Sequence, residues 1–358
     1  MEQQKTRAVN SAPKTPLIAW VGGQFFQPHM EALGFRTRLI SLPRPAALTW
    51  EDITERCGAA PDAVVYADRS LPPPLPGVQR YPCLTAFYCI DAHIHSWYPL
   101  YARAFDLCAV SLRDELPRFA KGRAPNRALW LPPFAEDRYR PREAKKEFDL
   151  LFVGTVDPQT TPLRHAFLQR LAGMFPALAV RRGDFADLLP RARVVLNIAE
   201  RGDLNFRVFE ALACGSCLLT PRIANGQPEL FREDMHFAAY ELDDAADCAR
   251  RARALLDDPP RILALARAGH ALVDAEHRPR RRAERFAAML RQGFDEQPHV
   301  RRLERSADRH GNRHEARPEN RPDAELRRSL RLLYLHWAEA CGDAQLAARY
   351  LDEARRLA

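Results

Sequence analysis

The stretch ARVVLNIAERGDLNFRVFEALACGSCLLT, residues 192–220, decides the expected fold. Its first apolar run predicts a strand that ends near Asn197, and a polar loop then leads to a helix expected from Asn205 to Cys214. A second apolar strand begins at Cys217, so the order is strand, helix, strand. This order is the repeating unit of a parallel sheet with helices packed on its faces.

The start of that helix also predicts an anion site. A helix N-terminus offers free N–H groups and the positive end of its dipole, and Arg207 adds a guanidinium that can hold two phosphate oxygens. Glu210 follows about one turn later, roughly on the same face, where a carboxylate can accept hydrogen bonds from both hydroxyls of a ribose. Phosphate followed by ribose is the layout of a nucleotide. A simpler alternative stays open, in which Arg207 and Glu210 only neutralise each other on the helix surface.

The alternation of strands and helices extends in both directions from this stretch. Apolar runs at 17–21, 63–66, 84–90, 107–111 and 128–131 are separated by helical patterns or loops, and the pattern restarts at 149 after a polar, proline-containing stretch. The expected fold class is therefore α/β, with two Rossmann-like doubly wound domains that face a cleft. We place the N-terminal domain at 17–138, a linker at 139–148 and the C-terminal domain at 149–294.

The segment YCIDAHIHSW, residues 88–97, raises a competing hypothesis, because Asp91-x-His93-x-His95 is how a metal-dependent amidohydrolase begins its metal site. That enzyme class needs further histidines at other strand ends. Most of the others fall in predicted helices or in a charged stretch, and only His236 precedes a strand. We therefore expect no metal site. Asp91 and His93 follow a strand directly, so they either cap the chain there or face a ligand in the cleft.

Residues 204–220, LNFRVFEALACGSCLLT, resemble the C-terminal-domain motif of the GT-B glycosyltransferases, most of all the CgeB-like (spore-maturation-type) branch near glycosyltransferase family 4. The segment DLLFVGTVDPQTTPLRHAFLQRL, residues 149–171, is similar to the opening of that family's C-terminal domain. The segment FYCIDAHIHSWYPLYARAFDLCAVS, residues 87–111, is similar to its N-terminal domain. The resemblance covers roughly residues 17–290.

The resemblance implies an enzyme that moves a sugar from a nucleotide-sugar donor to an acceptor hydroxyl without a metal or another cofactor. The donor-binding residues that it implies are Gly22, Gly23, Gly154, Thr155, Asn205, Arg207 and Glu210. The glycine-containing pairs would let the loops approach the phosphates, and the helix residues would hold the diphosphate and the ribose. The implied catalytic residues, Asp91 and His93, would face the transferred sugar or the acceptor hydroxyl.

The resemblance further implies a hexosyltransferase that retains the anomeric configuration, but the sequence departs from the pattern. Family 4 enzymes often carry two glutamates in an E-x7-E arrangement, and the first position here is Gly202, with Asp203 next to it. The usual phosphate-binding lysine is also missing, and Arg164 is a candidate to replace it. Two other functions stay open: a non-catalytic adaptor whose C-terminal helices recruit a partner, and an epimerase-like enzyme on the same scaffold.

The remaining segments lie outside the resemblance. Residues 1–16 are expected to form a disordered arm, residues 295–325 a charged flexible linker, and residues 326–358 a helical hairpin that resembles a tetratricopeptide unit. Gly342 and Asp343 mark the break between its helices as C-cap and N-cap. One hairpin cannot bury its apolar face alone. It must therefore dock on the main body, on another copy of the chain, or on a protein partner.

Composition limits the partners and the compartment. The net charge of +8 comes largely from late arginine-rich stretches, such as 277–286, which we expect to be solvated. Aromatic residues do not alternate with these arginines, so no nucleic-acid partner is expected. No apolar run reaches the ~20 residues that a membrane span needs. The eight cysteines show no disulfide-like spacing, which predicts reduced thiols and a cytoplasmic location.

Overall fold

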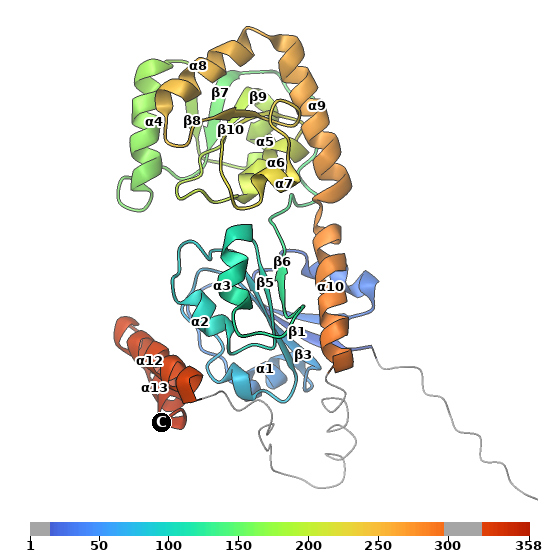
Figure 1. Cartoon of the computed structure of the whole chain (residues 1–358), viewed down its shortest axis with the longest axis vertical. Helices are drawn as coiled ribbons and strands as arrows, with labels where there is room; N and C mark the ends of the chain where they lie inside the picture. Colours follow the sequence, from blue (N-terminus) through green and yellow to red (C-terminus); the bar gives the residue numbers. More distant parts are fainter. Residues whose placement is uncertain (1–14, 297–323) are drawn as a thin grey trace, which may run out of the picture.

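The computed structural model describes residues 15–296 and 324–358. It contains two α/β domains stacked along the long axis of the molecule, with a pair of helices against the side of the first domain (Figure 1). The predicted fold class of two Rossmann-like domains and a C-terminal helical hairpin is confirmed. The arm expected at 1–16 and the charged linker expected at 295–325 fall almost wholly outside the described residues.

The first domain is built on a six-stranded parallel sheet in the order β2-β1-β3-β4-β5-β6. Its strands are β1 (Leu17–Gly22), β2 (Arg36–Ile40), β3 (Ala63–Ala67), β4 (Leu84–Cys89), β5 (Leu107–Val110) and β6 (Ala128–Trp130). Its helices are η1 (Gln27–Leu33), α1 (Trp50–Cys57), η2 (Val78–Arg80), α2 (Tyr98–Ala102), η3 (Arg113–Glu115) and α3 (Leu116–Ala120). Every residue of β1, β3, β4 and β5 is buried, because helices cover both faces of the sheet.

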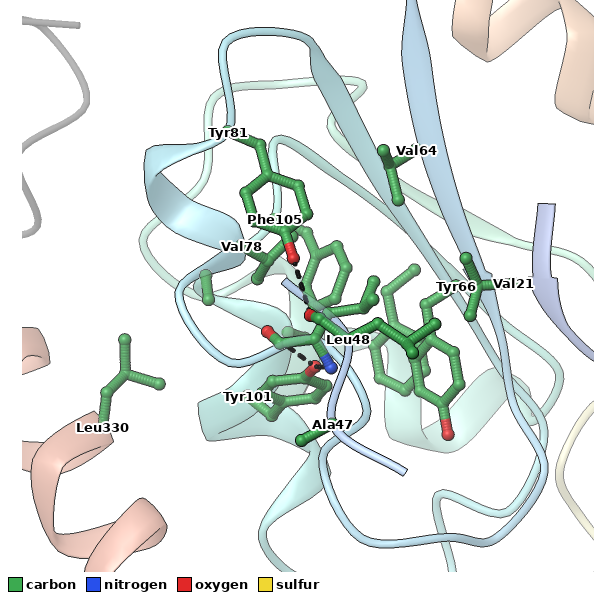
Figure 2. Packing of buried hydrophobic residues seen from close by; sticks show 14 of the residues in the cluster. Val21, Ala47, Leu48, Val64, Tyr66, Val78, Tyr81, Tyr101, Phe105 and Leu330 are labelled. Atoms are coloured by element: carbon green, nitrogen blue, oxygen red, sulfur yellow. Dashed lines mark hydrogen bonds between the residues drawn. The ribbon is translucent and has the colours of Figure 1, made fainter. Parts of the chain in front are cut away.

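Aromatic and aliphatic residues pack together in the core on one face of the first sheet (Figure 2). The phenol of Tyr81 donates a hydrogen bond to the carbonyl of Leu48 at 3.0 Å, and the amide of Leu75 donates to the phenol oxygen of Tyr101 at 3.1 Å. These bonds satisfy polar groups that burial would otherwise leave without partners. They also fix the irregular segments that follow β2 and β3 against the sheet.

The second domain carries a five-stranded parallel sheet in the order β11-β10-β9-β7-β8. Its strands are β7 (Phe148–Val153), β8 (Leu178–Arg181), β9 (Ala192–Leu196), β10 (Cys217–Pro221) and β11 (Ala238–Tyr240). Its helices are α4 (Pro162–Met174), α5 (Phe185–Leu188), η4 (Leu189–Arg191), α6 (Phe206–Ala213), α7 (Gln227–Leu230), α8 (Ala245–Leu256) and α9 (Pro259–Glu276). The strand order reverses between β7 and β9, and ligands of open α/β sheets bind in the crevice at such a point.

Helix α10 (Pro279–Glu296) follows α9 but packs on the first domain (Figure 1). Its buried residues Phe286 and Leu290 share a core with Trp20 and Phe26 of the first domain. The arginine-rich stretch 277–286, which we expected to be solvated, is therefore partly buried. Its most buried member, Arg282, is 2% exposed and donates to the carbonyl oxygens of Pro132 and Pro133 at 2.7 and 2.8 Å.

The C-terminal hairpin consists of α12 (Ala324–Ala340) and α13 (Ala344–Arg356), and it docks on the first domain of its own chain. Asp343 caps α13 by accepting hydrogen bonds from the amides of Gln345 and Leu346, both at 2.9 Å. The side chains of Leu330 and Tyr350 are fully buried in the first core. The sequence left three docking places open, and in the structure the hairpin docks on the main body.

Gly22 ends β1 in a backbone conformation that favours glycine. Its φ is +103°, and an added Cβ would lie only 2.2 Å from the carbonyl oxygen of Ala67 at the end of β3. The amide of Gly23 donates to that same oxygen at 2.9 Å. The two glycines therefore have a structural role in joining the carboxyl ends of β1 and β3.

No helix in the described ranges has the length and apolar character of a membrane span.

Candidate functional site

Three arginines surround the loop after β7, at the point where the strand order of the second sheet reverses. Arg207, from α6, donates through Nε to the carbonyl oxygen of Val153 at 3.0 Å. Arg164, from α4, donates to the carbonyl oxygen of Thr155 at 2.8 Å, and Arg182, beyond β8, reaches the Thr155 hydroxyl at 3.3 Å. The cluster is graded from buried Arg207 to exposed Arg182, so positive charge leads from the core to the surface.

Arg207 is a buried cation held by neutral groups. It is 9% exposed, its Nη1 donates to the side-chain oxygen of Asn197 at 3.1 Å, and its guanidinium lies 4.6 Å from the ring centre of Phe152. Burial, and then the nearby charge of Arg164, lower the pKa of Arg207 to about 10, so it stays protonated at neutral pH. No carboxylate forms an ion pair with it among residues 15–296 and 324–358. A buried charge without a direct counter-ion is costly, which favours an anionic ligand here.

Gly154 allows this arrangement. Its φ is +155°, and an added Cβ would lie 2.8 Å from Nη2 of Arg207. Any side chain at this position would therefore displace the guanidinium from the loop. The structure places Arg207 beside the loop that contains Gly154 and Thr155.

Asn205 lies at the N-cap of α6, but its side chain does not cap the helix. It turns back and donates to the carbonyl oxygen of Ile198 at 3.1 Å, which fixes the polar loop before the helix. Its side-chain oxygen is buried without a hydrogen-bond partner in the described part of the chain. The next residue, Phe206, stacks on Phe25 of the first domain with ring centres 6.0 Å apart. This contact brings the loop that contains Gly22 and Gly23 to the start of α6.

Glu210 faces the interdomain segment rather than Arg207. No ion pair joins it to Arg207 in the ranges that the structure describes. Its carboxyl instead lies near the phenol of Tyr139, whose oxygen accepts a hydrogen bond from Arg138 at 2.8 Å. Burial raises the pKa of Glu210 to about 7, although the Arg207 charge and the nearby Tyr139 phenol act in the opposite direction. The simple alternative of a helix-surface pair is therefore not what the structure contains.

Asp91 and His93 follow β4 at the edge of the first sheet. The chain end there is capped by another residue, Asp68, whose carboxylate accepts hydrogen bonds from the amides of Ile90 and Asp91 at 3.1 and 2.9 Å. The Asp91 carboxylate accepts one hydrogen bond, from the hydroxyl of Ser70. Burial, and then the Asp68 charge, raise the pKa of Asp91. Because Asp68 does the capping, the Asp91 side chain is left available for a ligand.

The amidohydrolase hypothesis finds no support in the geometry. Among the described residues, no three His, Cys, Asp or Glu side chains are placed so that they could hold a metal ion. Nδ1 of His93 and Nε2 of His95 are buried there without hydrogen-bond partners.

Sequence reasoning missed Arg182, Asp68 and Tyr139. The first two could have been found, because Arg182 and Asp68 come directly after strands, as Gly154 does. Tyr139 carries no such signal, since it lies in an irregular segment and reaches Glu210 only through the packing of that segment on α6.

Residues 160–288 match a protein-family model described as glycosyl transferase-like. Among solved structures, HepE of Anabaena, determined in complex with UDP and glucose, superposes with a TM-score of 0.56 and 10% identity over 77% of this chain and 100% of that chain. Sucrose-phosphate synthase from Thermosynechococcus elongatus superposes with a TM-score of 0.55 and 12% identity over 78% of this chain and 99% of that chain. WaaG, a glycosyltransferase involved in lipopolysaccharide biosynthesis, superposes with a TM-score of 0.51 and 13% identity over 75% of this chain and 98% of that chain.

These superpositions establish that the chain has the GT-B fold. They span both domains and nearly the whole length of the similar structures. Comparison with curated protein sequences gives no significant match.

Proposed function

We propose that this protein is a glycosyltransferase that moves a hexosyl group from a nucleotide-sugar donor to an acceptor hydroxyl. The observation that carries the proposal is Arg207, a buried cation without a carboxylate partner among the described residues, beside the loop at the switch point of the second sheet. The glycosyl transferase-like match covers α6, and HepE binds UDP and glucose on the same fold. The motif in 204–220 adds the CgeB-like branch to the proposal.

In this scheme the donor diphosphate lies against Gly154 and Thr155. Arg207 and Arg182 offer guanidinium groups to its oxygens, and Arg164 joins them if it exchanges its ion pair with Glu200 for the ligand. As the bond from the anomeric carbon to the phosphate oxygen breaks, negative charge grows on the diphosphate. Fixed guanidinium groups stabilise that charge without reorganising. They also supply the countercharge that a divalent metal gives in other enzymes, so we propose that transfer is metal-independent.

On the acceptor side, we propose that Asp91 receives the proton. The acceptor oxygen bonds to the anomeric carbon, the bond to the diphosphate oxygen breaks with its electron pair, and the hydroxyl proton passes to the Asp91 carboxylate, with His93 beside it. A carboxylate that acts from the opposite face gives inversion. The family resemblance implies retention, in which the proton goes to the departing phosphate. The NMR coupling constant of the anomeric proton in the product distinguishes the two, and a retained configuration would contradict the proton-accepting role of Asp91.

The adaptor hypothesis lacks the surface that it requires. Its C-terminal helices would have to present their apolar face to a partner, but Leu330 and Tyr350 are buried on the first domain of the same chain. A thermal-shift screen of the full chain against UDP-, GDP-, dTDP- and CMP-sugars, followed by measurement of released nucleoside diphosphate, tests the proposal. At least one donor should stabilise the protein and be consumed, with or without chelator. Absence of a shift with all four classes would overturn it.

Donor binding should depend on pH through Glu210. We propose that its ionised carboxylate accepts the ribose hydroxyls, which displace Tyr139. Because its pKa in the free protein is about 7, the carboxylate is mostly protonated at pH 6 and mostly ionised at pH 8. Affinity should therefore rise about tenfold from pH 6 to pH 8. Calorimetry with the nucleotide sugar measures this, since its diphosphate has no terminal phosphate group to titrate. Glu210→Gln is the control, and its affinity for the donor should not change between pH 6 and pH 8. An equal rise of affinity with pH in both proteins would contradict the assignment.

A further inference from the structure

Asp68 connects three segments at the acceptor-side edge of the first sheet. It follows β3, is 2% exposed, and accepts four hydrogen bonds. The donors are the amides of Ser70, Ile90 and Asp91, at 2.8, 3.1 and 2.9 Å, and the phenol of Tyr98 in α2, at 2.5 Å. A buried carboxylate with this many donors is satisfied by the protein alone. It is therefore fixed in place and has little capacity left for a ligand.

The same bonds fix the surroundings of Asp91. Ser70 has a φ of +52°, a left-handed conformation that is unfavourable for a residue other than glycine. Its amide is held by Asp68, and its hydroxyl donates to the Asp91 carboxylate. The amide of Asp91 is also bound by Asp68. Both the backbone and the side chain of Asp91 are thus positioned through Asp68, the second by way of a strained turn.

We propose that Asp68 is a positioning residue for the reaction, which holds Asp91 and Ser70 so that the Asp91 carboxylate can receive the proton of the acceptor hydroxyl. This inference rests on the proposed function, because it assumes that Asp91 acts on the acceptor. The positioning role of Asp68 does not follow from the family match, which begins at residue 160, in the second domain.

The charged groups around Asp91 determine the direction in which its pKa should move when a neighbour is removed. The titratable groups that surround it are Asp68, Cys89, His93 and His95, and Tyr66 and Tyr98 lie near Asp68. Burial raises the pKa of Cys89, Tyr66 and Tyr98, so these three stay neutral near pH 7. The Asp68 charge raises the pKa of Asp91, whereas the Ser70 hydroxyl lowers it. Removal of these two groups should therefore act in opposite directions.

The experiment follows the pKa of Asp91 by carbon-detected NMR of the carboxyl group and, in parallel, the acid limb of kcat/KM for the acceptor. In Asp68→Asn both should move to lower pH, by about one unit, because a like charge has been removed. In Ser70→Ala both should move to higher pH, because a hydrogen bond to the ionised form is lost. The KM for the donor should stay unchanged in both variants, since they lie in the other domain.

The matched control is Asp106→Asn. Asp106 also ties a strand end, since its carboxylate accepts hydrogen bonds from the amide and hydroxyl of Thr85 at 2.8 and 3.0 Å, but at the amino end of β4. It should lose stability without moving the pH profile. A pKa of Asp91 that is unchanged in Asp68→Asn, or an equal shift in Asp106→Asn, would overturn the inference. If Asp68→Asn does not fold, Ser70→Ala carries the same test, and an acid limb that stays in place would contradict it.

The two proposals fail in different ways. If Asp91→Asn keeps full transfer activity, the proposed role of Asp91 is wrong, whatever its pKa does in the other variants. If Asp91→Asn is inactive while Asp68→Asn leaves the pKa of Asp91 unchanged, the proposed function stands and the positioning role of Asp68 is wrong.

Discussion

Arg207→Met should weaken binding of the nucleotide sugar by about 100- to 1000-fold, because hydrogen bonds to charged groups contribute about 1.5–3 kcal/mol each and two of them are lost without simply adding. Methionine keeps an unbranched side chain against Phe152 and Phe185, the rings that now flank the guanidinium at 4.6 and 5.6 Å. Calorimetry with the donor measures the loss. Circular dichroism shows whether the second domain still folds, since the carbonyl of Val153 and the side chain of Asn197 each lose a donor.

Two further variants separate charge from shape. Arg207→Lys keeps the charge but cannot form two parallel hydrogen bonds, so its affinity should lie between those of the wild type and Arg207→Met. Arg164→Gln tests the same site from α4, and Arg170→Gln, on the same helix but paired with Asp243 at the surface, is its control. Arg164→Gln should weaken donor binding, and Arg170→Gln should leave it unchanged. Wild-type affinity in a folded Arg207→Met protein would remove the nucleotide site from this loop.

The sheets could be predicted from the sequence because parallel strands buried on both faces consist of nearly unbroken apolar residues. The run that contains Leu84–Cys89 is an example, since all six residues of β4 are buried. Asp91 and His93 were placed at the edge of the first sheet by the rule that ligands bind beyond the carboxyl ends of such strands. This rule needs only the position of the strand, which local sequence supplies.

Helix α10 could not be recognised in the same way, because its arginines conceal its buried face. Arg278 and Arg282 look like solvated charges, yet they are 8% and 2% exposed. Their guanidinium groups donate to backbone carbonyls about 140 to 150 positions earlier in the chain, such as those of Tyr139 and Pro132. Carbonyl groups this far away in the sequence reach these arginines only when both connections between the domains have formed, the linker before β7 and the junction of α9 with α10. The same limit explains why the contact of Tyr139 with Glu210 was missed.

For the C-terminal hairpin, the helices could be predicted from the sequence, but the surface on which they dock could not. The cap at Asp343 and the amphipathic pattern are local features. The ion pair between Arg80 and Glu353, whose side chain is 4% exposed, joins the hairpin to η2 across most of the chain. A glycine at position 77 makes room for it, since an added Cβ would lie 2.5 Å from Nη2 of Arg80. No local pattern links these three residues.

Tyr350→Ala should lower the free energy of unfolding by about 3–5 kcal/mol, the usual cost of truncating a fully buried aromatic side chain. Tyr350 is 0% exposed, packs on Tyr334 with ring centres 6.1 Å apart, and donates to the carbonyl of Pro73 at 3.0 Å. Leu332→Ala, on the facing helix, is the control: Leu332 is 58% exposed, and its loss should cost at most about 0.5 kcal/mol. Denaturant unfolding of the full chain, with hydrogen exchange of 324–358, measures both. Equal stability of the two variants would mean that the hairpin is not held on the first domain, and the apolar face of α13 would again be available to a partner.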